Sequence, residues 1–227
     1  MGLFSSKETN EDNDAVFDFH FPTSKKAVII FTRNPELGKC KTRLARSVGN
    51  ESALDIYKHL LKHTANTTKS INADKFVFYS EKIKKEDLWN DSIFRKKLQK
   101  GKDLGIRMEN AFIALFESGY QKVIIVGSDL LDLKTDHIND AFDRLNNHDV
   151  VFGPAKDGGY YLLGLSKLQA CIFRNKPWSE ANLLEVTLEE LGQKNISLTL
   201  LETLNDIDTF EDLKTYPQLK KFYNTYD

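Results

Sequence analysis

The residues best suited to chemistry are a group of cations between positions 33 and 46. Five cations and one acid give this segment a local charge of +4 (5 − 1): Arg33, Lys39, Lys41, Arg43 and Arg46 against Glu36. Arg makes bidentate contacts to phosphate and Lys supplies a point charge, so the composition favours a di- or triphosphate ligand. Gly38 would let the backbone approach that ligand, and the N-terminus of the following helix would add its amide groups; Thr42 is a further candidate contact.

This basic segment does not match the Walker P-loop. Gly38-Lys39 is followed by Cys40 rather than by Ser or Thr, and no glycine precedes it at the required distance. The alternative to phosphate binding is a solvated basic loop that begins a helix.

A second candidate group is the carboxylate of Asp129, which follows an apolar run in the sequence Gly127-Ser128-Asp129. An Asp at the end of a buried strand is well placed to hold Mg²⁺ or Mn²⁺ beside a phosphate, because these cations prefer hard oxygen ligands. Ser128 is a further candidate contact to the donor substrate. The alternative role for Asp129 is the N-cap of the helix that follows.

A third group of acids lies near the end of the chain. Asp206 and Asp208 would lie on one face of an extended segment, where they could bind a metal or the substrate. Asp208 or Thr209, followed by Glu211-Asp212, also has the pattern of a helix start, so one of these acids could simply be a cap.

Two glycine-containing segments complete the candidate site. In the first, Asp157 could contact an acceptor or act as a base, and Gly158 and Gly159 would expose backbone to a substrate; a plain hairpin turn is the alternative. In the second, Gly105 and Arg107 stand at an expected helix start and could meet another phosphate or a sugar.

Short apolar runs and amphipathic stretches predict the elements that position these residues. Runs without polar alternation are typical of parallel strands covered on both faces; they lie at 27–31, 76–79, 123–126 and 150–152. Apolar residues at helical spacing predict helices over 51–64 and 108–116, between successive strands. This alternation predicts a doubly wound α/β domain, in which ligands bind at the carboxyl ends of the strands.

Length and charge limit the remaining classes. The 227 residues fit one domain, which we place at 26–227, after a polar tail at 1–25. A net charge of −1 argues against a nucleic-acid binder, and no apolar run approaches the ~20 residues of a membrane span. The two cysteines have no zinc-ligand spacing, which favours a reducing, cytoplasmic location. The oligomeric state cannot be read from these patterns.

Six segments spread over residues 26–214 together resemble a known bacterial family; in order, they are TRNPELGKCKTRL, KDLGIRM, GSD, VVFGPAKDGGYYLLGL, PWS and DIDTFEDL. It is the radical-SAM/selenodomain-associated transferase family, long classed as a domain of unknown function and linked to arsenosugar biosynthesis. The resemblance implies a glycosyltransferase-A fold, a Rossmann-like three-layer sandwich with a mostly parallel mixed sheet. It also implies nucleotide or nucleotide-sugar binding, with a divalent metal on Asp129 and on the Asp206/Asp208 pair. Related sequences often have a Pro two residues after the Asp of the GSD segment, where this chain has Leu131.

Three functions are consistent with this resemblance and with the residues. The first is a glycosyltransferase that uses a nucleotide-diphosphate sugar, a divalent metal and a small-molecule acceptor, although the Asp-x-Asp signature common in such enzymes is missing after 123–126. The second is a nucleotidyltransferase, like those that make molybdenum-cofactor dinucleotides or phospholactyl-guanosine. In that case Lys39, Lys41 and Arg43 would stabilise the pyrophosphate leaving group. The third is a nucleotide-binding protein without catalytic activity.

Overall fold

The computed structural model describes residues 21–223 of the chain as an α/β domain. Seven strands form its centre: β1 (Lys26–Thr32), β2 (Asp74–Tyr79), β3 (Phe94–Leu98), β4 (Lys122–Val126), β5 (Val150–Pro154), β6 (Tyr160–Leu165) and β7 (Leu198–Leu200). The helices are α1 (Thr42–Val48), α2 (Asn50–Lys69), α3 (Leu104–Glu117), α4 (Thr135–Arg144), α5 (Leu183–Gln193) and α6 (Phe210–Lys214), with 3₁₀ turns η1 (Ala170–Ile172) and η2 (Pro217–Phe222). No helix within the described residues is both long and apolar enough to span a membrane.

The seven strands form one mixed sheet in the order β3-β2-β1-β4-β6-β5-β7. Strand β6 is antiparallel to both of its neighbours, β4 and β5, and the other pairings are parallel. Strand β1 lies between β2 and β4, so the loop that follows it begins near the middle of the sheet. The carboxyl ends of β1 and β4 are adjacent, which is where doubly wound sheets bind ligands.

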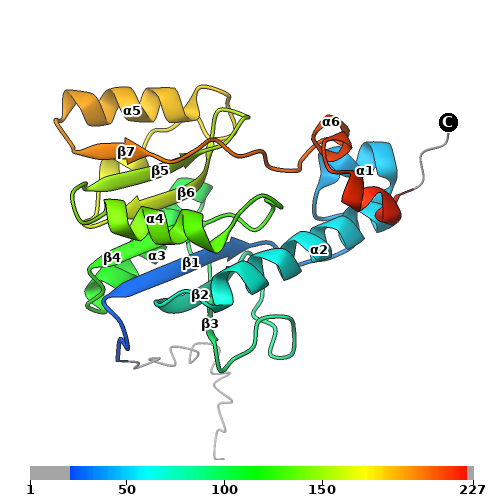
Figure 1. The fold of residues 1–227 in the computed structure, drawn as a ribbon, viewed down its shortest axis with the longest axis horizontal. Helices are drawn as coiled ribbons and strands as arrows, with labels where there is room; N and C mark the ends of the chain where they lie inside the picture. The colour runs from blue at the N-terminus through cyan, green and yellow to red at the C-terminus, as the bar shows by residue number, and fades with distance from the viewer. Residues whose placement is uncertain (1–20, 224–227) are drawn as a thin grey trace, which may run out of the picture.

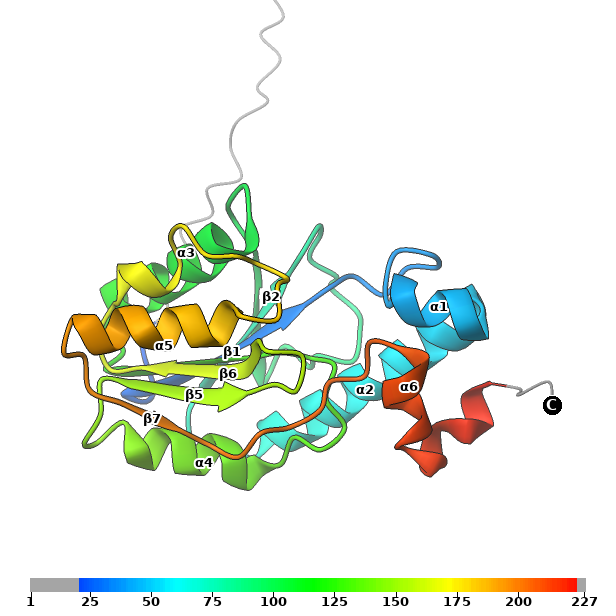
Figure 2. The ribbon, with the colours of Figure 1, turned by 90° about the horizontal axis from the view of Figure 1, so that it is seen from above.

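Helices cover both faces of the sheet and make it the middle of three layers (Figures 1 and 2). Alternate residues of β1 serve the two faces: Val28 and Ile30 pack with α2 and α4, and Ala27 and Ile29 pack with α3 and α5. All four side chains are fully buried. Burial on both faces explains why these strands are continuous apolar runs without polar alternation.

A third, smaller core lies beyond the carboxyl end of β1, where α1, α6 and the amino-terminal part of α2 come together (Figure 1). Leu44, Ile56, Leu213 and Leu219 are fully buried there. Ile207, also fully buried, belongs to the same core and lies between Asp206 and Asp208. This packing fixes the segment that carries the two acids.

The structure confirms the expected fold class and the four strands predicted from apolar runs. Three strands were not predicted: β3 (FRKKL) and the three-residue β7 lie at the edges and are polar or short, and β6 follows a glycine-rich turn. Residues 1–20, most of the predicted tail, lie outside the described residues. Thr23 already contacts the domain, since its amide and its hydroxyl both donate to the Asp74 carboxylate. The boundary between tail and domain at residue 25 stays a prediction.

Candidate functional site

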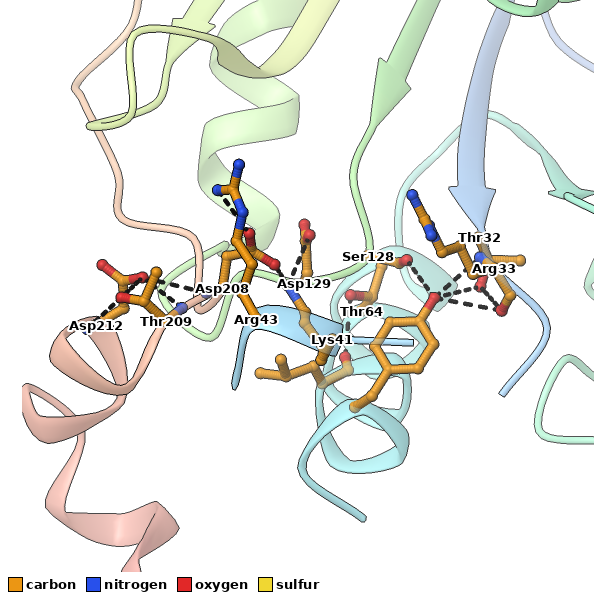
Figure 3. Close-up of polar contacts among 12 residues, drawn as sticks. Thr32, Arg33, Lys41, Arg43, Thr64, Ser128, Asp129, Asp208, Thr209 and Asp212 are labelled. Carbon is orange, nitrogen blue, oxygen red and sulfur yellow. Dashed lines mark hydrogen bonds and ion pairs between the residues drawn. The ribbon is translucent and has the colours of Figure 1, made fainter. Parts of the chain in front are cut away.

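The centre of the site is the ammonium group of Lys41, which lies between two carboxylates (Figure 3). Its Nζ is 3.0 Å from Asp129 Oδ2 and 3.7 Å from Asp208 Oδ1. Only 5% of the Lys41 side chain is exposed. Burial alone would lower the pKa of Lys41, but the surrounding carboxylates, Asp129 first, raise it above its usual value. Lys41 is therefore a fixed positive charge within an acidic group.

The backbone that presents Lys41 is unusual. Lys41 precedes the first residue of α1 and has φ 50° and ψ 44°, in the left-handed region that non-glycine residues seldom adopt. Gly38, three residues earlier, also has a positive φ of 73°. Strained positions of this kind persist where surrounding contacts hold them, and they gather at functional sites. The two ion pairs of Lys41 and the packing of Leu44 in the third core supply those contacts.

Tyr57 of α2 joins the ends of β1 and β4. Its hydroxyl accepts a hydrogen bond from the Arg33 amide at 2.9 Å and donates to the Arg33 carbonyl at 3.3 Å. Its oxygen is also 3.4 Å from Ser128 Oγ. The sequence placed Tyr57 on the apolar face of a helix and gave no signal of this polar role. Ser128 was predicted to contact the donor substrate; the structure gives it this internal hydrogen bond.

A cleft of about 300 Å³ opens beside the carboxylates. Asp129, Asp157 and Asp206 line it together, although they come from three distant parts of the chain. Burial first, and then the nearby carboxylates of Asp129 and Asp157, raise the pKa of Asp206 to about 6. Asp206 thus carries its charge at neutral pH against the effect of its surroundings.

The remaining walls of the cleft are largely apolar. Aromatic and aliphatic side chains from both sides of β4 line it: Phe31, Leu104, Met108, Leu130, Tyr160, Trp178 and Leu183. Glu180, which the sequence analysis did not single out, adds a fourth carboxylate. Among the described residues, no Lys, Arg or His lines this cleft. Its composition is acidic and apolar.

The Asp157-Gly158-Gly159 segment is both a turn and a wall. It joins the antiparallel strands β5 and β6, with the Ala155 amide donating to the Gly159 carbonyl at 3.0 Å, so the hairpin alternative is confirmed. Gly158 has φ +89°, and a Cβ there would lie 1.7 Å from the Ala181 carbonyl oxygen. Its own carbonyl accepts from the Leu184 amide at 3.0 Å. Gly158 therefore docks the segment that contains Trp178 and Glu180, while Asp157 and Gly159 face the cleft.

The basic loop after β1 lies outside the lining of the cleft. Lys39 Nζ is 2.8 Å from Glu36 and its side chain is largely exposed, as is that of Arg43, whose Nη1 is 3.1 Å from Asp208 Oδ2. Thr42 and Arg33 are also exposed. None of these four side chains lines the cleft. That they bind the donor substrate stays a prediction.

The remaining predicted contacts lie at the start of α3, which faces the cleft through Leu104 and Met108. A Cβ on Gly105 would lie 2.3 Å from the Phe173 carbonyl oxygen, so the structure gives Gly105 a packing role against the 173–178 segment. Arg107 Nε donates to the Gly101 carbonyl at 3.0 Å, which closes the loop before the helix. Neither residue lines the cleft.

The arrangement of the carboxylates suits a metal ion that also binds the substrate. It suits less well a metal ion held by protein ligands alone. No group of three or more His, Cys, Asp or Glu side chains within residues 21–223 is arranged to hold a metal ion. Asp129 and Asp206 face the cleft, but Asp208 contacts Lys41 and Arg43 instead. Mg²⁺ commonly takes one or two carboxylates, with water and substrate phosphates as its other ligands. Burial first, and then the carboxylates of Asp129 and Asp157, raise the pKa of Asp206, and a cation beside these carboxylates would offset the second effect.

Comparison with known proteins points to nucleotide-using transferases. The model of a family described as an uncharacterized protein conserved in bacteria, DUF2064, matches residues 63–180. A curated relative, 2-phospho-L-lactate guanylyltransferase of Methanocaldococcus vulcanius, is 27% identical over 193 residues, 82% of each chain.

Solved structures agree with this fold. A crystal structure described as a candidate nucleotide-diphospho-sugar transferase from Desulfovibrio desulfuricans is 31% identical, covers 89% of this chain and 90% of its own, and superposes with a TM-score of 0.80. A cytidylyltransferase from Leptospira borgpetersenii, 14% identical over 91% of this chain and 89% of its own, has a TM-score of 0.58 and shares the fold.

Proposed function

We propose that this chain, which belongs to the DUF2064 family of uncharacterized bacterial proteins, is an enzyme that transfers a nucleotidyl group from a nucleoside triphosphate to a small acceptor. From the sequence, glycosyl transfer is the first hypothesis and nucleotidyl transfer is the second. The position of the Lys41 ammonium group leads us to place nucleotidyl transfer first.

The observation that carries the proposal is the buried ammonium of Lys41 beside Asp129 at the carboxyl ends of β1 and β4. Nucleotidyl transfer builds negative charge on the phosphate that is attacked and on the pyrophosphate that leaves. A cation held in place before the reaction stabilises that charge without reorganising. Asp129 has no second acid two residues away, so the Asp-x-Asp signature that would favour glycosyl transfer is missing.

In the proposed reaction, an oxygen of the acceptor forms a bond to the α-phosphorus of the donor. The bond from that phosphorus to the oxygen shared with the β-phosphate breaks, and pyrophosphate leaves. Lys41 contacts the phosphates at the reacting centre, and Lys39 and Arg43 receive the leaving pyrophosphate from the open side. Tyr57 acts as a positioning residue because it holds the end of β1 against Ser128.

Asp129 and Asp206 are the residues that would hold Mg²⁺ or Mn²⁺ against the phosphates. When bound, the ion would neutralise phosphate charge and orient the donor. Asp208 would then act through Lys41 and Arg43, since it contacts both.

A second candidate is transfer of a sugar from a nucleotide-diphosphate sugar. The relative that favours it is the candidate nucleotide-diphospho-sugar transferase, which is 31% identical over most of both chains. The curated guanylyltransferase, at 27% identity over 82% of each chain, favours nucleotidyl transfer. The link to arsenosugar biosynthesis implied by the family resemblance would fit either chemistry and stays a prediction.

The test is a panel of donors assayed with Mg²⁺. Each nucleoside triphosphate is incubated with the protein and with 2-phospho-L-lactate, a hexose or a hexosamine, and pyrophosphate is measured. Nucleotide-diphosphate sugars are assayed with the same acceptors for nucleoside diphosphate. We expect pyrophosphate from at least one triphosphate. Nucleoside diphosphate from a nucleotide sugar, with no pyrophosphate in any mixture, would favour the second candidate.

A further inference from the structure

Resting on the proposed nucleotidyl transfer, we infer that the cleft is the acceptor site and that it selects a neutral or cationic molecule with a hydroxyl nucleophile rather than a phosphorylated or carboxylated one. The inference concerns the cleft of about 300 Å³ beside Asp129, which the basic loop does not line.

The reaction geometry assigns the acceptor to this cleft. In phosphoryl-group chemistry, the attacking and leaving oxygens lie roughly in line on opposite sides of the phosphorus. The cations suited to the leaving pyrophosphate, Lys39 and Arg43, have largely exposed side chains and do not line the cleft. We therefore place the attacking oxygen on the side of Asp129 that faces the cleft. There the cleft is walled by β4, β6, the 155–159 turn and residues 178–183.

The charge of the cleft determines the class of acceptor. Four carboxylates line it, and among the described residues no cationic side chain does; they are Asp129, Asp157, Glu180 and Asp206. A divalent ion on Asp129 and Asp206 would still leave Asp157 and Glu180, in addition to the phosphates of the donor. Like charges brought together in a binding site are strongly unfavourable, so an anionic acceptor is rejected.

The walls of the cleft indicate which uncharged or cationic groups of the acceptor it can bind. Trp178 and Tyr160 provide aromatic surface, and Met108 and Leu183 provide aliphatic surface. Carboxylates next to aromatic walls are suited to hydroxyl and ammonium groups, through hydrogen bonds and cation–π contact. A sugar, an amino sugar or an amino alcohol has this chemistry.

A hydroxyl nucleophile also needs a proton acceptor, which a phosphate nucleophile does not. Asp157 lies on the wall of the cleft, and its Oδ1 is held by the Gly159 amide at 2.9 Å. As the acceptor oxygen bonds to the α-phosphorus, its proton passes to the Asp157 carboxylate and pyrophosphate leaves. Proton and charge are thereby balanced within the cleft.

The experiment compares matched ligands that differ by one phosphate. Binding of glucosamine and glucosamine 6-phosphate, and of glycerol and glycerol 3-phosphate, is measured by ligand-observed NMR. The whole protein is used, with Mg²⁺, with and without a non-hydrolysable nucleoside triphosphate. We expect the unphosphorylated member of at least one pair to bind about tenfold more tightly. The double variant Asp157→Asn with Glu180→Gln should reduce that preference about tenfold.

The control variant is Glu117→Gln, which removes an exposed acid at the far end of α3 and should leave the preference unchanged. Equal or tighter binding of the phosphorylated members, or a preference that the double variant does not alter, would overturn the inference. Failure of every nucleotide to bind would instead contradict the proposed function, and the ligand pairs measured without nucleotide would still decide the charge preference of the cleft.

Discussion

Lys41 has the central role in the proposed reaction because it is a buried cation paired with the acids at the strand ends. The Lys41→Met substitution removes the charge and keeps much of the apolar volume. We expect it to lower kcat about 10²- to 10³-fold, the usual loss when one preorganised group at the reacting phosphate is removed. The measurement is steady-state turnover of the donor identified by the panel.

The matched control for Lys41 is Lys58→Met. Lys58 is exposed on α2 and pairs with Asp55 on the same helix, so its loss should change turnover less than threefold, about the effect of a surface ion pair. Comparable losses in both variants would mean that Lys41 acts through general electrostatics and not at the reacting centre.

Asp206 is predicted to lower the stability of the protein while it serves the site. Its pKa is raised from 3.8 to about 6, so the folded protein binds a proton more tightly than the unfolded chain does. Protonation of Asp206 therefore contributes to the free energy of unfolding. This contribution is fully present below pH ~4 and is lost as the pH rises through ~6. Two pKa units correspond to about 3 kcal/mol, and solvent screening of the partly exposed side chain reduces this to about 1–2 kcal/mol.

The Asp206→Asn variant should therefore be more stable than the wild type by about 1–2 kcal/mol at pH 7.5 without added metal, and no more stable near pH 4. Denaturant unfolding at the two pH values measures the difference. A variant that is less stable at pH 7.5 would show that Asp206 makes favourable contacts, and that these outweigh the free-energy cost of its partly buried charge.

At the scale of elements, the 155–159 turn and the 178–183 segment form the cleft only because they meet at Gly158. In Gly158→Ala, the new Cβ would lie 1.7 Å from the Ala181 carbonyl oxygen, at a φ of +89°. We expect a loss of about 2 kcal/mol or more in stability and a marked loss of acceptor binding, because the two walls separate. Thermal unfolding and the ligand-observed NMR assay measure both effects.

Gly192→Ala is the matched control. Gly192 lies in α5, and a Cβ there would meet nothing within 4 Å, so the substitution should be neutral or stabilise by up to about 1 kcal/mol through helix propensity. If the two alanine variants behaved alike, the close approach at Gly158 would not be what holds the cleft together.

Sequence patterns predicted the elements whose two faces meet the same kind of surroundings. Strand β1 is apolar on both faces because helices cover both, and its pattern could be recognised directly. Strand β3 carries Arg95, Lys96 and Lys97 at the edge of the sheet, where no such pattern is required. The hairpin nature of the 155–159 turn was one of two alternatives, because a glycine pair looks the same in a turn and in a substrate wall.

The types of residue in the site could be predicted from the sequence. Which of these residues contact one another could not. Lys41 and Asp129 were both candidates, yet their ion pair joins positions 88 residues apart and depends on the pairing of β1 with β4. The left-handed backbone of Lys41 has no sequence signal, since glycine is the usual residue there. Glu180 was missed because it lies in an irregular segment whose position depends on the contact with Gly158.

At the scale of the whole molecule, the family match covers residues 63–180, which is less than the sheet requires. Strand β1 lies outside this range and pairs with both β2 and β4. A fragment of residues 63–180 would leave β2 and β4 without β1 and β5 without β7, and it would lose the fully buried side chains of β1. We expect the fragment to be unfolded or aggregated and residues 21–223 to fold, as judged by circular dichroism and gel filtration. A folded, monomeric fragment would contradict this view of β1 as the central strand.

The charge distribution of the molecule agrees with the proposed reaction. The net charge of −1 arises from 32 basic and 33 acidic residues, yet the loop after β1 is basic and lies outside the lining of a cleft that carries four carboxylates. Near-neutrality overall thus coexists with a strong local separation of charge, which can hold a phosphate donor on one side and reject anions on the other.

The most direct test of the central claim is calorimetric titration of the wild type and Lys41→Met with nucleoside triphosphates and nucleotide-diphosphate sugars, each with and without Mg²⁺. We predict that the wild type binds a triphosphate only when Mg²⁺ is present, and that Lys41→Met weakens this binding at least tenfold. Binding of nucleotide sugars alone, or triphosphate affinity that Lys41→Met leaves unchanged, would contradict the assignment of Lys41 to the phosphates of a nucleotidyl donor.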